Sequence, residues 1–138
     1  MQHVLVDTNV VIELLVEREP YVREAVEIFQ LLESGKVKAS VCATTVTTVD
    51  YLASESVGTG PSRKLIDFLM ALCDVADVNK RVLLAALSSP MKDFEDAVIA
   101  ESAKASGIPT IITRNGKDFV DCGLNVYSPR QWLAASAI

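Results

Sequence analysis

The sequence predicts an α/β fold, a three-layer α/β/α sandwich around a mostly parallel sheet of four to five strands. Short apolar runs suited to buried strands alternate along the chain with stretches of helical periodicity. Such alternation is typical of βαβ units with right-handed crossovers. The chain has 138 residues, of which 50% are hydrophobic, which suits a single domain over residues 1–138.

The first half of the chain contains two predicted strands and three predicted helices. Residues 2–6 form a short apolar run that ends at Asp7. Pro20 is well placed as the first residue of a helix, and Ser34-Gly35 forms its stop signal. The elements expected after it are a strand at 38–43, a helix at 45–56 and, after the break at 58–61, a helix at 61–72.

The second half continues the alternation. Residues 73–78 read as a third strand, and Asn79 can cap the helix that follows. Asp93 starts another helix that runs to Ser106, where Gly107 and Pro109 stop it. The remaining elements are strands at 110–113 and 124–127 and a terminal helix that begins near Ser128-Pro129.

Composition excludes several classes of protein. No apolar run approaches the ~20 residues of a membrane span, and no leader precedes the first strand, so we expect a cytoplasmic protein without a membrane partner. The three cysteines are far apart and read as buried free thiols. His3 is the single histidine, which excludes a histidine-pair ribonuclease. A net charge of −5 and a pI near 4.8 argue against broad electrostatic capture of nucleic acid.

Acidic residues stand where apolar runs end or helices begin. Asp7 follows the first strand, Asp93 and Asp96 open a helix, and Asp118 follows the fourth strand. In a parallel sheet, side chains beyond the carboxyl ends of the strands meet in one crevice. Carboxylates gathered there repel one another unless a cation lies among them, and Mg²⁺ or Mn²⁺ prefers oxygen ligands.

Local structure offers a second explanation for each acid. Asp7 and Asp93 are both suited to cap the helices that follow them. Asn115 precedes a glycine, which is a common turn sequence, and Asp118 can cap a short helical turn. Capping explains Asp96 less well, because the helix behind it is apolar and packs inward, so the carboxylate at its mouth faces the sheet ends. Glu95 is expected to face solvent.

Three separated segments, which together span essentially the whole chain, are 5–12 (LVDTNVVI), 92–97 (KDFEDA) and 112–119 (ITRNGKDF). In their sequence and order, these segments resemble the PIN-domain family. The resemblance implies a Mg²⁺- or Mn²⁺-dependent endoribonuclease. It also implies a VapC-like toxin with an antitoxin partner, and a homodimer for which the helices at 20–33 and 61–72 are candidate interfaces. Ordinary core packing explains those two helices equally well.

The resemblance assigns roles to individual residues. Asp7 matches the family's first acid and Asp96 the acid that opens the later crossover helix. Asn115 falls where many members carry an aspartate, and Asp118 is the nearby acid that shares or replaces its role. These four are the candidate catalytic residues. Metal ligands are expected among Asp7, Asp96, Asp118 and Asp93, and substrate contacts among Arg114, Lys117, Thr8 and Asn9.

The chain departs from the family at its second acid. That acid is usually a glutamate in the helix after the second strand, and the matching position here is Thr48. Asp50 lies two residues further on, roughly 200° around a helix, and does not point the same way. The chain therefore resembles a subgroup with an altered second acid, in which Asp93 is a candidate replacement.

Four hypotheses about function follow. The first is metal-dependent hydrolysis of RNA phosphodiesters, in which a metal-activated water leaves a 5′-phosphate and a 3′-hydroxyl. The second is a non-catalytic PIN-like module that binds RNA or protein. The third is a phosphoacceptor receiver domain, which needs an acidic pair after the first strand and a lysine after the fifth, and this chain has neither. The fourth is a haloacid-dehalogenase-type phosphatase, which needs Asp-x-Asp, and this chain has Asp7-Thr8-Asn9 in its place.

Overall fold

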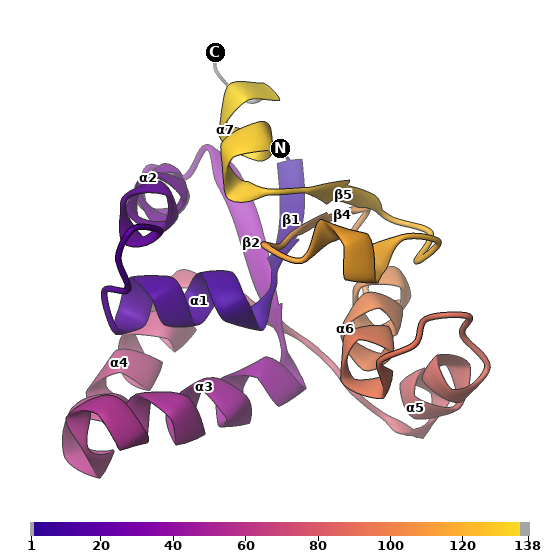
Figure 1. The fold of residues 1–138 in the computed structure, drawn as a ribbon, viewed down its shortest axis with the longest axis horizontal. Helices are drawn as coiled ribbons and strands as arrows, with labels where there is room; N and C mark the ends of the chain where they lie inside the picture. The colour runs from indigo at the N-terminus through magenta and orange to yellow at the C-terminus, as the bar shows by residue number, and fades with distance from the viewer. Residues whose placement is uncertain (1, 136–138) are drawn as a thin grey trace.

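A computed structural model, which describes residues 2–135, contains one five-stranded sheet in which every pairing is parallel (Figure 1). The strand order is β3-β2-β1-β4-β5, so β1 lies at the centre with β2 and β4 on either side. The strands are β1 (Gln2–Val6), β2 (Val37–Cys42), β3 (Asp74–Ala76), β4 (Thr110–Ile112) and β5 (Asn125–Tyr127).

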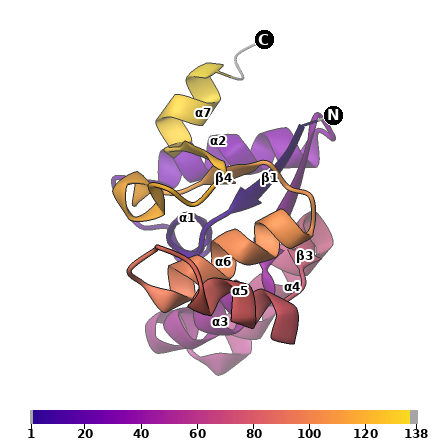
Figure 2. The same ribbon diagram turned by 90° about the vertical axis from the view of Figure 1, so that its right-hand side faces the viewer.

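Helices cover both faces of the sheet, as the sequence predicts (Figures 1 and 2). In Figure 1 the α1–α4 helices lie to the left of the central strands and α5 and α6 to the right; Figure 2 shows α5 and α6 in front. The helical segments are α1 (Thr8–Leu15), α2 (Val22–Glu33), α3 (Ala43–Val57), α4 (Thr59–Leu72), α5 (Lys80–Leu87), α6 (Phe94–Ala105), the short 3-10 helix η1 (Gly116–Phe119) and α7 (Pro129–Ala135).

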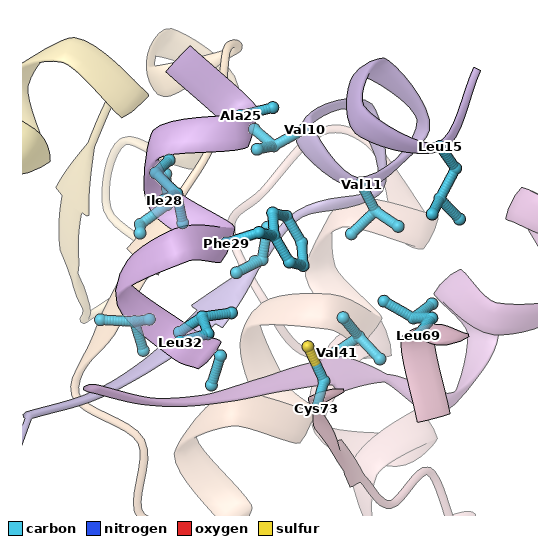
Figure 3. Packing of buried hydrophobic residues seen from close by; sticks show 14 of the residues in the cluster. Val10, Val11, Leu15, Ala25, Ile28, Phe29, Leu32, Val41, Leu69 and Cys73 are labelled. Carbon is cyan, nitrogen blue, oxygen red and sulfur yellow. The ribbon is translucent and has the colours of Figure 1, made fainter. Parts of the chain in front are cut away.

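The alternation of side chains along β1 divides the core in two. Val4 and Val6 join the cluster formed with α1, α2, α3 and α4, whereas Leu5 points to the cluster beneath α5 and α6. In Figure 3 the first cluster surrounds Phe29 of α2, which is 2% exposed and lies among side chains from α1, β2 and the end of α4. Both candidate interface helices, α2 and α4, therefore contribute to the core.

Element boundaries differ slightly from those predicted. The helix expected to begin at Pro20 begins at Val22, and Pro20 lies in the turn before it. The strand expected over 73–78 is confined to Asp74–Ala76, since it pairs with β2 on one side only. No helix among residues 2–135 has both the length and the apolar composition needed to cross a membrane.

Candidate active site

The candidate site lies at the carboxyl ends of the two central strands, β1 and β4. Their register pairs Val6 with Ile112, so the next residues, Asp7 and Thr113, emerge side by side. The backbone N–H of Asp7 donates to the carbonyl of Ile112 over 2.9 Å, which extends the ladder to the point where α1 begins. This is the edge at which open parallel sheets bind ligands.

Asp7 is held by a hydrogen bond to each of its carboxylate oxygens. Oδ1 accepts from the backbone N–H of Thr8 over 2.8 Å, which caps α1, and Oδ2 accepts from Thr113 Oγ1 over 2.7 Å. The residue is 3% exposed, and this burial raises the pKa of its carboxyl group while the two hydrogen bonds oppose the rise. Asp7 is therefore both the cap of α1 and a rigidly oriented carboxylate.

Asp96 lies in the first turn of α6 and has the most perturbed carboxyl group of the site. Burial, together with the nearby charges of Asp93 and Asp7, raises its pKa to about 7. Asp93 Oδ1 accepts from the backbone N–H of Asp96 over 2.9 Å, so the predicted N-cap of this helix is confirmed. No Lys or Arg among residues 2–135 forms an ion pair with either carboxylate. The two carboxylates are therefore not neutralised by a direct ion pair.

Asp7 and Asp96 line a hollow of about 230 Å³, which we call the acidic crevice. It brings together five of the predicted site residues, and the helix residues Ile12, Leu52 and Ile99 form its apolar wall. The predicted residues are Asp7, Thr8, Asn9, Asp96 and Asn115, and they are joined by Arg18 and Glu95.

The other predicted acids, Asp93 and Asp118, line a second hollow of about 380 Å³ together with Lys92 and Lys117, the lysine hollow. Both acids remain close enough to act on the crevice, because the charges of Asp93 and Asp118 contribute to the raised pKa of Asp96. The four predicted acids are thus divided between two hollows, with Asp7 and Asp96 in the acidic crevice and Asp93 and Asp118 in the lysine hollow.

Arg114, predicted to bind substrate, is instead held by three groups from α1 and the segment around α2. Its Nε donates to both carboxylate oxygens of Glu13, over 2.9 and 3.1 Å, and one terminal nitrogen donates to Glu24 over 2.6 Å. The other terminal nitrogen donates to the carbonyl of Tyr21, whose ring lies 4.5 Å from the guanidinium. Each of the three guanidinium nitrogens donates to a protein acceptor, which supports a positioning role, and the phosphate contact of Arg114 stays a prediction.

Two predicted substrate contacts also hold the site together. Thr8 Oγ1 and Thr45 Oγ1 are 2.8 Å apart, which joins α1 to α3. Asn9 Oδ1 accepts from the backbone N–H of Arg114 over 3.2 Å and ties α1 to the segment after β4. Both side chains therefore have a structural task in addition to their place in the crevice wall.

The helix α3 presents threonines where the resemblance implies an acid. Thr48 is one turn beyond Thr45 and one turn before Leu52, and both of these neighbours face the site. Asp50 faces away, as predicted, because its carboxylate binds Arg63 Nε at 3.1 Å and Ser62 Oγ at 2.8 Å. Arg63 accordingly lowers the pKa of Asp50.

Three residues at the site were missed from the sequence. Thr113 follows β4 as Asp7 follows β1, and the alignment of the two strand ends is the signal that points to it. Glu95 is exposed, as expected, but it also lines the crevice and raises the pKa of Asp7. Arg18 reaches the crevice from the turn after α1, and no periodicity marks that turn.

Comparison with known proteins identifies the family. A model described as "PIN domain" matches residues 3–117, which is most of the chain. The chain belongs to the PIN-domain family. The match contains all of the predicted site except Asp118, which follows its last residue directly. A search of curated proteins found no match.

Solved structures from toxin-antitoxin systems share this PIN fold. The chain is 15% identical to a chain of VapBC2 from Rickettsia felis bound to promoter DNA, with a TM-score of 0.70 and coverage of 92% of this chain and 98% of that one. A chain of a toxin-antitoxin complex from Klebsiella pneumoniae is 24% identical, with a TM-score of 0.67 and coverage of 91% of this chain and 97% of that one. VapC20 of Mycobacterium tuberculosis, a sarcin-ricin loop cleaving toxin, is 14% identical, with a TM-score of 0.69 and coverage of 85% of this chain and 93% of that one. These identities establish a common fold.

The donor set of this PIN domain fits a hard divalent cation in its chemistry. The candidate ligands are carboxylate and amide oxygens, and burial together with the neighbouring acids raises the pKa of Asp96. Among residues 2–135, no three His, Cys, Asp or Glu side chains converge closely enough to hold one ion. Mg²⁺ commonly uses only one or two carboxylates and keeps several waters, so the arrangement suits Mg²⁺ or Mn²⁺ held partly through water and substrate phosphate.

Proposed function

We propose that this PIN domain is a Mg²⁺- or Mn²⁺-dependent endoribonuclease that hydrolyses RNA phosphodiesters in the cytoplasm as the toxin of a toxin-antitoxin pair. The observation that carries the proposal is the group of carboxylates around Asp7 and Asp96. Neither carboxylate forms an ion pair within 4.0 Å among residues 2–135, and the pKa of Asp96 is raised to about 7. Such a site stays charged at neutral pH most readily with a bound cation.

Each carboxylate has a distinct part in binding the ion. Asp7 is fixed by Thr8 and Thr113, so it supplies a preorganised ligand. Asp96 is partly exposed at the mouth of α6 and supplies the second, with Asp93, Asp118 and Asn115 completing the set directly or through water. When bound, the cation would lower the pKa of a water molecule and neutralise the oxygens of the phosphodiester.

The chain's other residues bind and orient the RNA. Arg18 lines the acidic crevice and forms no ion pair among residues 2–135, so its guanidinium is free to hold a phosphate oxygen. Thr8 and Asn9 line the crevice with Asp7 and position the substrate there.

The proposed partner is an antitoxin, in line with the toxin-antitoxin complexes from Rickettsia felis and Klebsiella pneumoniae that share the fold. Expression in bacterial cells tests this part of the proposal. We expect the wild-type chain to arrest growth and Asp7→Asn to relieve the arrest. Growth unaffected by the wild-type chain, at matched protein levels, would contradict a toxin role.

One observation favours a second function. Thr48 stands where the family resemblance implies a glutamate, so the site has fewer acids than a typical family member. A PIN-like module that binds RNA or protein without cutting would tolerate this loss. It predicts no cleavage at any metal concentration and no calorimetric signal for ion binding.

Cleavage of a pool of structured RNAs by the purified protein separates the two functions. The reactions contain Mg²⁺, Mn²⁺ or EDTA, with an Asp7→Asn/Asp96→Asn double variant alongside. We expect metal-dependent cutting that the double variant loses, with 5′-phosphate and 3′-hydroxyl ends. Cyclic-phosphate ends would contradict hydrolysis by water, and full activity in the double variant would contradict the site.

A further inference from the structure

We propose that the lysine hollow holds the nucleotide next to the scissile phosphate, with Lys92 and Lys117 contacting the phosphate that flanks the cut. The proposal rests on the endoribonuclease function and names a subsite that the acidic crevice does not contain. It is drawn from the charge, exposure and position of residues in the loop before α6 and in η1.

The hollow adjoins the acids without being part of the crevice. Asp93 and Asp118 line it, and the charges of both act on Asp96, which lines the crevice. The two hollows are also connected through the start of α6, where the carboxylate of Asp93 accepts a hydrogen bond from the backbone N–H of Asp96. A strand of RNA whose phosphate lies among the acids therefore has the lysine hollow within reach of a neighbouring nucleotide.

Lys92 and Lys117 supply the positive charge that such a neighbour requires. Both are exposed, both line the hollow, and neither forms an ion pair within 4.0 Å among residues 2–135. By contrast, Lys38 and Lys104 are paired with acids elsewhere on the molecule. Two free ammonium groups beside a cluster of carboxylates are placed to bind a phosphate that the carboxylates alone would repel.

The hollow also has an apolar side and the size of a small-ligand site. Met91 and Val120 line it, and Val120 is 61% exposed, so its apolar side chain is accessible to a ligand in the hollow. A volume of about 380 Å³ falls within the range of small-molecule sites. An apolar wall facing two lysines suits a nucleotide, whose base is largely apolar on its face and whose phosphate is an anion.

The three aspartates of the lining restrict what the hollow can bind. Asp93, Asp118 and Asp121 outnumber the lysines, so a free anion gains little from entering alone. A nucleotide joined to a phosphate in the acidic crevice is different, because its entry is intramolecular and because Asp93 and Asp118 are candidate ligands of the metal. The proposal therefore applies to connected RNA and excludes mononucleotides as ligands.

Binding of a fluorescent single-stranded RNA in Mg²⁺ by the Asp7→Asn chain, which is expected not to cut, tests the proposal. The test variant adds Lys92→Gln and Lys117→Gln; the control adds Lys36→Gln and Lys64→Gln, two exposed lysines that line neither hollow. We expect the test pair to weaken binding about tenfold and to reduce the log–log salt slope by about 1.4, as loss of two phosphate contacts on a single strand requires. Equal effects of the two pairs, or no effect of either, would overturn the proposal.

A truncation series with the unaltered active site gives a second readout. Substrates are shortened stepwise from the 5′ or the 3′ side of the cleavage position. We expect shortening on one side alone to lower kcat/KM in the wild type and to have no such effect in Lys92→Gln/Lys117→Gln. A variant that keeps the wild-type length dependence would overturn the subsite. Absence of cleavage by the wild type would contradict the endoribonuclease function, whereas the binding experiment would still decide whether the lysines contact RNA.

Discussion

Thr113 donates a 2.7 Å hydrogen bond to Oδ2 of Asp7, although 106 positions separate the two residues in the sequence. Both residues are buried, with 0% exposure for Thr113 and 3% for Asp7. Because β1 and β4 are neighbours in register, the bond joins the ends of the two central strands. It fixes the direction in which the Asp7 carboxylate faces the crevice, and the second bond, from the N–H of Thr8, leaves little freedom to turn.

Replacement of Thr113 by Val tests this coupling. Valine keeps the shape but leaves Oδ2 of a buried carboxylate without its donor, which costs about 1–3 kcal/mol of unfolding free energy. We expect urea unfolding to report that loss and cleavage to fall with it, because Asp7 is no longer oriented. Thr110→Val is the control, since Thr110 accepts only a long 3.4 Å bond from Asn125. Equal stability of the two variants would contradict a structural role for Thr113.

Arg114 provides a second prediction, about stability. Arg114→Ala leaves Glu13, which is 5% exposed, as a buried charge without its partner, and we expect a loss of about 2–4 kcal/mol. Arg114→Lys should recover little, because one ammonium cannot reproduce the contacts to Glu13, Glu24 and the Tyr21 carbonyl. Denaturant unfolding is the measurement.

The matched control for Arg114 is Arg63→Ala, which breaks an exposed ion pair with Asp50 and should have a much smaller effect. RNA affinity distinguishes positioning from direct contact. If Arg114→Ala were as stable as the control but bound RNA much more weakly, the substrate contact predicted from the sequence would be right and the positioning role wrong.

The pKa of Asp96 predicts how stability depends on pH. Its value of about 7, against 3.8 ordinarily, means that the folded state holds this proton over a range in which the unfolded state has lost it. The stabilisation is complete below pH about 4 and is lost as pH rises to about 7. Asp96→Asn, which cannot ionise, should therefore be more stable than the wild type above pH 7. Solvent screening of the partly exposed carboxyl reduces the expected gain to about 1 kcal/mol.

Thermal unfolding in EDTA from pH 4 to 8 measures this difference between the wild type and Asp96→Asn. The single substitution isolates Asp96 from Asp7, whose pKa is also raised. Adding Mg²⁺ at pH 7.5 should then raise the Tm of the wild type more than that of the variant, because the ion replaces the missing counter-charge. A variant less stable than the wild type at pH 8 in EDTA would contradict the assigned environment of Asp96.

The sequence was sufficient for the parts of the site that are local. Apolar runs placed the strands, and the acids directly after them or at a helix start, Asp7 and Asp96, line one crevice. Contacts made across the fold could not be read in this way. Arg114 lies 90 positions from Glu24, and its use as a structural cation depends on where α2 packs. Glu95 and Arg18 reach the crevice through the orientation of a helix end and a turn, which periodicity does not specify.

Thr48 offers a direct test of whether the altered second acid limits the site. Thr48→Glu places a carboxylate on the face of α3 that lies between Thr45 and Leu52, where the family resemblance implies one. We expect calorimetry to give several-fold tighter Mg²⁺ binding, because a further oxygen ligand joins Asp7 and Asp96. The control is Thr47→Glu, which adds the same charge on an exposed position about 100° away around the helix. If both variants changed Mg²⁺ affinity equally, the gain would be general electrostatics, and Thr48 would lie outside the metal site.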